Sequence, residues 1–173
     1  MTPTRLHIGG REPREGWKIL NIQQRAGVDY VGNCIDLSQF ADGSIQELYA
    51  SHVYEHPSYQ GELQRALKEA FRVLVPNGVL RVSVPDFATL CQLAIDPKLA
   101  VNDRFQVMRM MFGGQMDPHD FHRVGLSGEL LAYFLKDAGF TQQSQVDEFK
   151  LFDDTSSLRM FGRLISLNIE ARK

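Results

Sequence analysis

The chain has 173 residues, of which 43% are hydrophobic and 23% are charged, and its formal net charge is −2. This length and this ordinary composition favour one globular domain spanning residues 1–173 and argue against a disordered chain. A nucleic-acid-binding domain would carry a strong excess of basic residues, so we expect no nucleic-acid partner.

The two cysteines, Cys34 and Cys91, lie far apart and outside any CxxC motif. We therefore expect neither a disulfide framework nor a cysteine-rich zinc site. No segment reaches the roughly 18 consecutive apolar residues of a membrane-spanning helix. The N-terminal residues also lack the apolar segment of a secretory leader, so we expect a cytoplasmic protein without a membrane partner.

Short strand-like segments open the chain and follow one another closely. They are residues 5–8, 17–22, 28–31 and 47–50, and Gly9-Gly10 follows the first of them. Only residues 11–16 separate the first two segments, whereas a parallel crossover with its helix needs about 10–12 residues or more. The first crossover is therefore predicted to lack its helix.

Helical and strand-like segments then alternate. A helix is predicted over 63–74 from its apolar face, with Ser58 as its cap and residues 76–78 ending it. The remaining predictions are a strand at 79–84, helical structure over 87–112 with a break near 96–97, a loop at 113–124, a helix at 128–137 between Ser127 and Gly139, and strands at 146–152 and 164–171. This order predicts an α/β fold with a mostly parallel sheet and an antiparallel hairpin at its edge.

Three segments, at residues 44–56, 66–86 and 126–140, carry motifs in a characteristic order and spacing. Together they resemble small bacterial class I methyltransferases of the type 11 kind that use S-adenosylmethionine. Residues 44–56, SIQELYASHVYEH, are similar to the fourth strand and the following turn of that family. Residues 66–86 resemble the next helix and strand, and residues 126–140 resemble a late helix. The resemblance implies a Rossmann-like methyltransferase fold, a seven-stranded sheet with an antiparallel last strand, an abbreviated N-terminal part, and methyl transfer to a small-molecule or sugar-type acceptor.

The resemblance also implies where S-adenosylmethionine would lie, since ligands of such sheets bind at the carboxyl ends of the strands. Gly9 and Gly10 would let the backbone approach the cofactor closely. Gln23 stands where the family has a carboxylate that binds the ribose hydroxyls. An amide accepts hydrogen bonds without the help of a charge, so a weaker contact is expected.

The turn after the third strand differs from the family in the same way. Asn33, followed by Cys34, stands where the family has an acid for the adenine amino group, and Asp36 lies close enough in sequence to compensate or to cap the local turn. Ser51 and His52 are implied to lie beside the cofactor. These amides either tune the affinity or mark a non-catalytic binding or scaffolding subunit with the same fold.

Histidines supply the candidates for acid–base chemistry. His56 is implied to lie near the acceptor, and His119 and His122 belong to the polar loop at 113–122, so the three are candidate bases or acceptor contacts. His119 and His122 lack a clear third ligand, and we predict no metal site. The methionines near this loop are consistent with core packing or with a contact between two copies, that is, a homodimer.

Residues 52–56 also match HxxEH, the inverted motif of some zinc peptidases. That chemistry needs both histidines on one continuous helix. Pro57 follows His56 directly and disfavours helical backbone at that histidine. A zinc hydrolase therefore remains a remote alternative.

Overall fold

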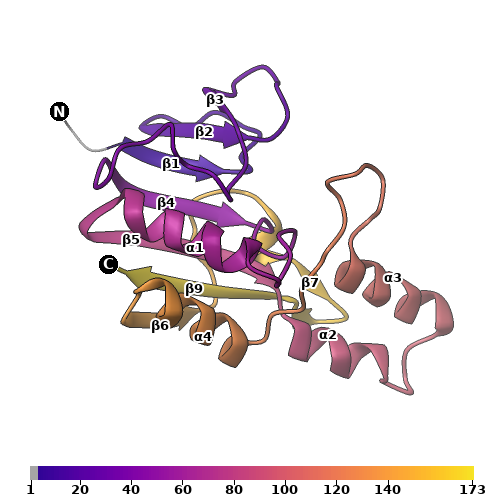
Figure 1. The fold of residues 1–173 in the computed structure, drawn as a ribbon. Coiled ribbons are helices and arrows are strands. Elements are labelled where there is room, and N and C mark those ends of the chain that lie inside the picture. Colours follow the sequence, from indigo (N-terminus) through magenta and orange to yellow (C-terminus); the bar gives the residue numbers. More distant parts are fainter. Residues whose placement is uncertain (1–3) are drawn as a thin grey trace.

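The computed structural model describes residues 4–173 and contains a seven-stranded sheet with the strand order β3-β2-β1-β4-β5-β9-β6 (Figure 1). The strands are β1 (Thr4–Ile8), β2 (Trp17–Asn21), β3 (Tyr30–Val31), β4 (Ile45–Ser51), β5 (Leu74–Pro85), β6 (Gln142–Val146) and β9 (Ser166–Arg172). Only β9 runs antiparallel to its neighbours, β5 and β6. This topology confirms the predicted Rossmann-like sheet.

The helices lie in two groups. α1 (Glu62–Val73) and α4 (Gly128–Ala138) pack on one face of the sheet, whereas α2 (Phe87–Ala94) and α3 (Val101–Phe112) lie beyond the carboxyl end of β5 (Figure 1). The predicted break in the 87–112 segment falls between α2 and α3. Within the described part of the chain, no helix has the length and apolar character needed to cross a membrane.

The apolar core lies between α1, α4 and the sheet. α1 buries the face predicted from its sequence, since Leu63, Ala66, Leu67 and Ala70 are completely inaccessible to solvent. The prediction that Ser58 caps this helix is wrong. Ser58 instead accepts the backbone N–H of Gln60 at 3.1 Å, in a turn that precedes the true N-cap.

α1 also ends earlier than predicted. It stops at Val73, and the chain passes directly into β5, where Leu74 pairs with Ile45. The chain then bulges through residues 75–78, where Asn77 has a φ of 64°, before the ladder resumes at Val79. The ammonium of Lys173 donates to the carbonyl of Leu74 at 2.8 Å, so this carbonyl at the C-cap of the helix has a hydrogen-bond partner. The predicted Pro-Asn-Gly stop is not needed to end the helix.

The N-terminal part of the sheet has no crossover helices. The connections over 9–16, 22–29 and 32–44 contain no helix, which confirms the prediction for the first crossover and extends it to the next two. Aromatic residues of the C-terminal segment instead cover the face of the sheet that lies opposite α1 and α4. The ring of Phe152 lies 4.1 Å from His7, 4.7 Å from Tyr49 and 5.3 Å from Trp17, measured between centroids.

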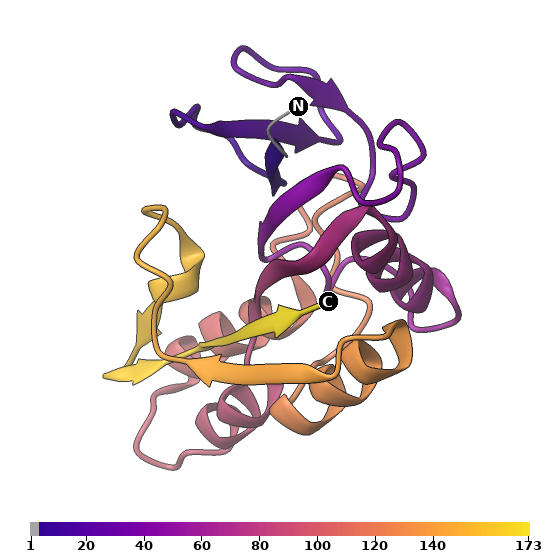
Figure 2. The same ribbon diagram turned by 90° about the vertical axis from the view of Figure 1, so that its left-hand side faces the viewer.

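This aromatic cover explains a wrong prediction in the tail. The penultimate strand was expected at 146–152 but lies at 142–146. Phe149 and Phe152 lie in the segment where the strand was expected, but they pack against the face of the sheet and not along its edge. The predicted antiparallel edge pairing, between β6 and β9, is confirmed. A short helical turn, η1 (Thr155–Ser157), and a two-stranded ribbon of β7 (Arg159–Met160) and β8 (Arg163–Leu164) complete the segment, which Figure 2 shows from the side.

Two buried tyrosines allow a matched test of this packing. The hydroxyl of Tyr49 donates to Asp154 at 2.8 Å, whereas the buried hydroxyl of Tyr54 has no partner among residues 4–173. We expect Tyr49→Phe to lower the free energy of unfolding by about 1–3 kcal/mol, and Tyr54→Phe to be neutral or stabilising. Urea denaturation of the two variants measures this difference, and equal losses would contradict the assigned role of Asp154.

Candidate functional site

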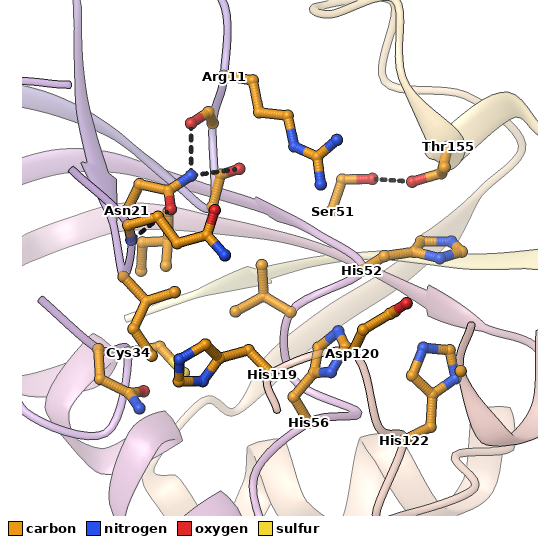
Figure 3. Close-up of a pocket in the computed structure, with 18 of the residues that line it drawn as sticks. Arg11, Asn21, Cys34, Ser51, His52, His56, His119, Asp120, His122 and Thr155 are labelled. Atoms are coloured by element: carbon orange, nitrogen blue, oxygen red, sulfur yellow. Dashed lines mark hydrogen bonds between the residues drawn. The ribbon is translucent and has the colours of Figure 1, made fainter. Parts of the chain in front are cut away.

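A pocket of about 960 Å³ opens at the carboxyl ends of β1, β2 and β4 (Figure 3). Its opposite wall comes from the loop at 113–123 and from residues 152–155. The volume lies at the upper end of the range for small-molecule sites, and the position is the one where open α/β sheets bind ligands. The pocket is therefore the candidate functional site.

Gly9 and Gly10 form the part of the pocket that follows β1. Asn21, at the end of β2, donates its side-chain amide to the carbonyl of Gly10 at 2.9 Å and to that of Gly9 at 3.3 Å, which fixes the loop. A Cβ atom added at Gly10 would lie 2.7 Å from the imidazole of His7. The glycine pair thus leaves bare backbone facing the pocket. Sequence reasoning missed Asn21, although an amide closing an apolar strand is a usable signal.

The chain after β2 places an arginine at the pocket, where the resemblance implies an acid. Gln23 lines the pocket, and the Arg25 guanidinium donates to its Oε1 atom. Arg11 lines the same pocket and extends into it (Figure 3). The side-chain oxygen predicted to accept the ribose hydroxyls therefore already has one donor.

The turn after β3 supplies Asn33 and Cys34 to the pocket lining. The Asn33 side chain accepts the N–H of Ile35 at 3.1 Å. Burial, together with the charge of Glu55, raises the pKa of the Cys34 thiol to about 12, so this thiol stays protonated. Asp36 lies outside the pocket lining and accepts the N–H of Ser38 at 3.0 Å, which is the turn-capping role that competed with cofactor binding.

Ser51 and His52 line the pocket at the end of β4. The hydroxyl of Ser51 lies 3.1 Å from that of Thr155, which connects β4 to the C-terminal segment (Figure 3). The 52–56 segment is a turn, with a φ of 52° at His52, and not a helix. The helical geometry that zinc peptidases need for HxxEH is therefore absent from this segment.

Three histidines surround one buried carboxyl group. The side chain of Glu55 is 2% exposed, and its Oε1 atom lies 3.7 Å from His52 Nδ1, 3.9 Å from His56 Nε2 and 3.7 Å from His122 Nε2. Burial raises the pKa of Glu55 to about 8. Burial, reinforced by a neighbouring histidine, lowers the pKa of His52 and that of His122 to about 4, and burial lowers the pKa of His56 as well.

The structure separates the three histidines that were candidates for acid–base chemistry. His56 and His122 lie together, with ring centroids 4.9 Å apart, whereas exposed His119 lines the pocket without joining this pair (Figure 3). Sequence reasoning treated His56, His119 and His122 equally as candidates. It met Glu55 only within the HxxEH match, because nothing in the local pattern shows that the 113–123 loop folds back onto the turn after β4.

Comparison with known proteins identifies the fold. Residues 15–82 match the family model described as a methyltransferase domain. The chain has the fold of the S-adenosylmethionine-dependent methyltransferases. No curated protein matches the sequence.

Solved structures from three organisms illustrate the match. An S-adenosylmethionine-dependent methyltransferase of Archaeoglobus fulgidus is 14% identical, with a TM-score of 0.61 over 99% of this chain and 87% of that one. One from Methanosarcina mazei is 17% identical, with a TM-score of 0.59 over 98% and 92%. One from Thermotoga maritima is 18% identical, with a TM-score of 0.54 over 98% and 82%. At these low identities, the structural likeness shows the shared fold alone.

Proposed function

We propose that this protein transfers a methyl group from S-adenosylmethionine to a small-molecule or sugar-type acceptor. The observation that carries the proposal is the pocket at the carboxyl ends of β1, β2 and β4, within a methyltransferase fold. Every predicted cofactor residue except Asp36 lines this pocket.

The pocket has the size for the cofactor, and its lining offers hydrogen-bonding groups that suit it. The bare backbone at Gly9 and Gly10 would receive the cofactor closely, and the side-chain amides of Gln23 and Asn33 would contact its ribose and adenine. When bound, S-adenosylmethionine supplies an activated methyl group on a sulfonium. The protein then needs to align the acceptor with this methyl group and to prevent the acceptor from binding in other orientations.

The acceptor would lie at the histidine-lined end of the pocket. His56, His119 and His122 all line it, and His119 is the most exposed of the three. Polar side chains that can both donate and accept hydrogen bonds suit a hydroxyl-bearing acceptor. His119 is therefore the proposed first contact for that acceptor.

A methyl-transfer assay tests the activity. The full chain is incubated with S-adenosylmethionine labelled on the methyl group and with a panel of sugars and small hydroxylated acceptors. Labelled product above the level of a heat-denatured control is expected for at least one acceptor class. Cofactor binding without transfer to any acceptor would favour the non-catalytic binding or scaffolding subunit.

A substitution at the end of β2 tests the ribose contact. We expect Gln23→Glu to tighten S-adenosylmethionine binding by about fivefold, or about 1 kcal/mol, because a carboxylate accepts hydrogen bonds more strongly and retains lone pairs after pairing with Arg25. Gln24→Glu adds the same charge at an exposed neighbour outside the pocket lining and serves as the control. The same change in affinity for both variants, measured by titration calorimetry, would argue against ribose binding at Gln23.

A further inference from the structure

Glu55 presents an unusual problem of hydrogen bonding. Its side chain is buried in the turn after β4, and neither carboxyl oxygen has a hydrogen-bond partner in the described chain, residues 4–173. A buried carboxylate without partners is strongly unfavourable. The nearest polar atoms are nitrogens of His52, His56 and His122, at 3.7–3.9 Å from Oε1, which is too long for direct hydrogen bonds.

Backbone carbonyls fix the tautomers of two of these histidines. Nδ1 of His56 lies 3.1 Å from the carbonyl oxygen of Phe121, and Nδ1 of His122 lies 3.1 Å from that of Met110. A carbonyl oxygen only accepts, so both Nδ1 atoms carry the hydrogen. In the neutral imidazoles, each Nε2 atom then directs a lone pair toward Glu55.

His52 also faces Glu55 with an unprotonated nitrogen, but this nitrogen is Nδ1 and not Nε2. The hydroxyl of Ser166 donates to the carbonyl of Thr155 at 2.6 Å, so it accepts from Nε2 of His52 at 3.0 Å. Nδ1 of His52 therefore also directs a lone pair toward Glu55.

Three imidazole lone pairs and a carboxyl group thus converge without a protein hydrogen for each of them. A single proton on Glu55 would serve one nitrogen and leave two. Charging all three imidazoles would bury three cations around one carboxylate, at a large desolvation cost. A metal cation would satisfy Glu55 and the lone pairs of two of these imidazoles, His56 and His122, whose ligand atoms lie together with that of Glu55.

We propose that Glu55, His56 and His122 bind a divalent transition-metal ion such as Zn²⁺. One carboxylate and two imidazoles form an established ligand set for catalytic zinc and for related divalent ions. One ligand atom from each of the three lies within 4.8 Å of the others. Donors at about 2.1 Å around a tetrahedral ion are about 3.4 Å apart, so the ligand atoms would move up to about 1.4 Å closer together on binding the ion.

The surroundings have the further features of a metal site. Metal-binding histidines generally donate their second N–H to a carbonyl or carboxylate, which here are the carbonyls of Phe121 and Met110. His56 and His122 line the pocket, whereas Glu55 lies behind them. The open coordination position therefore faces the pocket, where it would take a water molecule or a hydroxyl oxygen of the acceptor.

Only this last role rests on the proposed methyltransferase function; the metal site itself does not. The proposal also reassigns His56 and His122 from candidate bases to ligands. His119, which lies apart from Glu55, keeps its role as an acceptor contact.

Metal binding is tested on the full chain after treatment with a chelator. Titration with Zn²⁺ alone, followed by calorimetry, is expected to show one ion bound per chain, and Co²⁺ is expected to give the visible absorption of a site with imidazole and carboxylate ligands. Loss of a second-shell partner typically weakens metal binding 10–100-fold, so His56→Gln and His122→Gln are each expected to weaken it by at least about 100-fold. His119→Gln is the matched control and is expected to bind Zn²⁺ like the unaltered chain.

Three results would overturn the proposal: no Zn²⁺ binding by the unaltered chain, undiminished binding by His56→Gln and His122→Gln, or equal loss in His119→Gln. If these variants fail to fold, nitrogen NMR of the unaltered chain decides. Zn²⁺ must then shift the Nε2 resonances of two histidines, and unchanged resonances contradict the site. S-adenosylmethionine binding is measured separately without metal, so the failure of one proposal leaves the other intact.

Discussion

Gly10→Val is expected to weaken the binding of S-adenosylhomocysteine, the demethylated cofactor, by about 10–100-fold, which corresponds to the cost of about 1–3 kcal/mol that overpacking typically carries. The new side chain starts 2.7 Å from the imidazole of His7. That ring cannot turn away freely, because it is buried and packs between Tyr49 and Phe152. The valine must therefore displace the loop or project into the pocket.

Gly128→Val is the matched control for this substitution. A Cβ at Gly128 meets only Leu167 and Gln145, at 3.9–4.0 Å, and Gly128 does not line the pocket. Calorimetric titration is expected to show unaltered affinity in this variant. Normal affinity in Gly10→Val would show that the cofactor does not bind against the end of β1.

Gly113→Ala is expected to lower the free energy of unfolding by about 2–3 kcal/mol, which combines backbone strain with overpacking. Gly113 has a φ of 86°, in the left-handed region that favours glycine. An added Cβ would overlap the carbonyl oxygen of Asp120 and lie 3.1 Å from the backbone nitrogen of His122. Both contacts are backbone atoms at the neck of the loop, so neither can rotate away.

The contact between Gly113 and the backbone of Asp120 and His122, at the base, or neck, of the 113–123 loop, matters because it holds His122 close to Glu55. The N–H of His122 donates to the carbonyl of Phe112 at 3.1 Å, directly beside Gly113. Gly114→Ala is the control, because its Cβ meets chiefly the carboxylate end of Asp120, a side chain that can move. For a chain of this size, the loss expected in Gly113→Ala corresponds to a fall in melting temperature of about 4–12 °C. Equal melting temperatures for the two variants would contradict this account of the neck.

Most of the fold follows from local pattern. The apolar face of α1, the caps Ser127 and Gly139 of α4, and the short link between β1 and β2 each predict the observed element. These features depend on residues close together in sequence. The position of β6 does not, because Phe149 and Phe152 are drawn to the opposite face of the sheet by Trp17 and Tyr49 from distant strands.

The residues of the candidate site also differ in how far the sequence predicts them. Gly9, Gly10 and Ser51 follow strands, and the resemblance to methyltransferases assigned them to the cofactor; all three line the pocket. The contacts of other site residues were not predicted. Arg25 donates to the side-chain oxygen of Gln23 from only two residues away, across a bend that the sequence pattern does not reveal. His122 lies close to Glu55 only because the 113–123 loop folds back.

Cofactor binding is the central claim, and calorimetric titration of the full chain with S-adenosylmethionine and S-adenosylhomocysteine tests it most directly. The pocket at the ends of β1, β2 and β4 predicts saturable binding of both compounds at one site per chain. The cationic end of β2 predicts an affinity that Gln23→Glu improves. Absence of binding to either compound at millimolar concentration would contradict the proposed function.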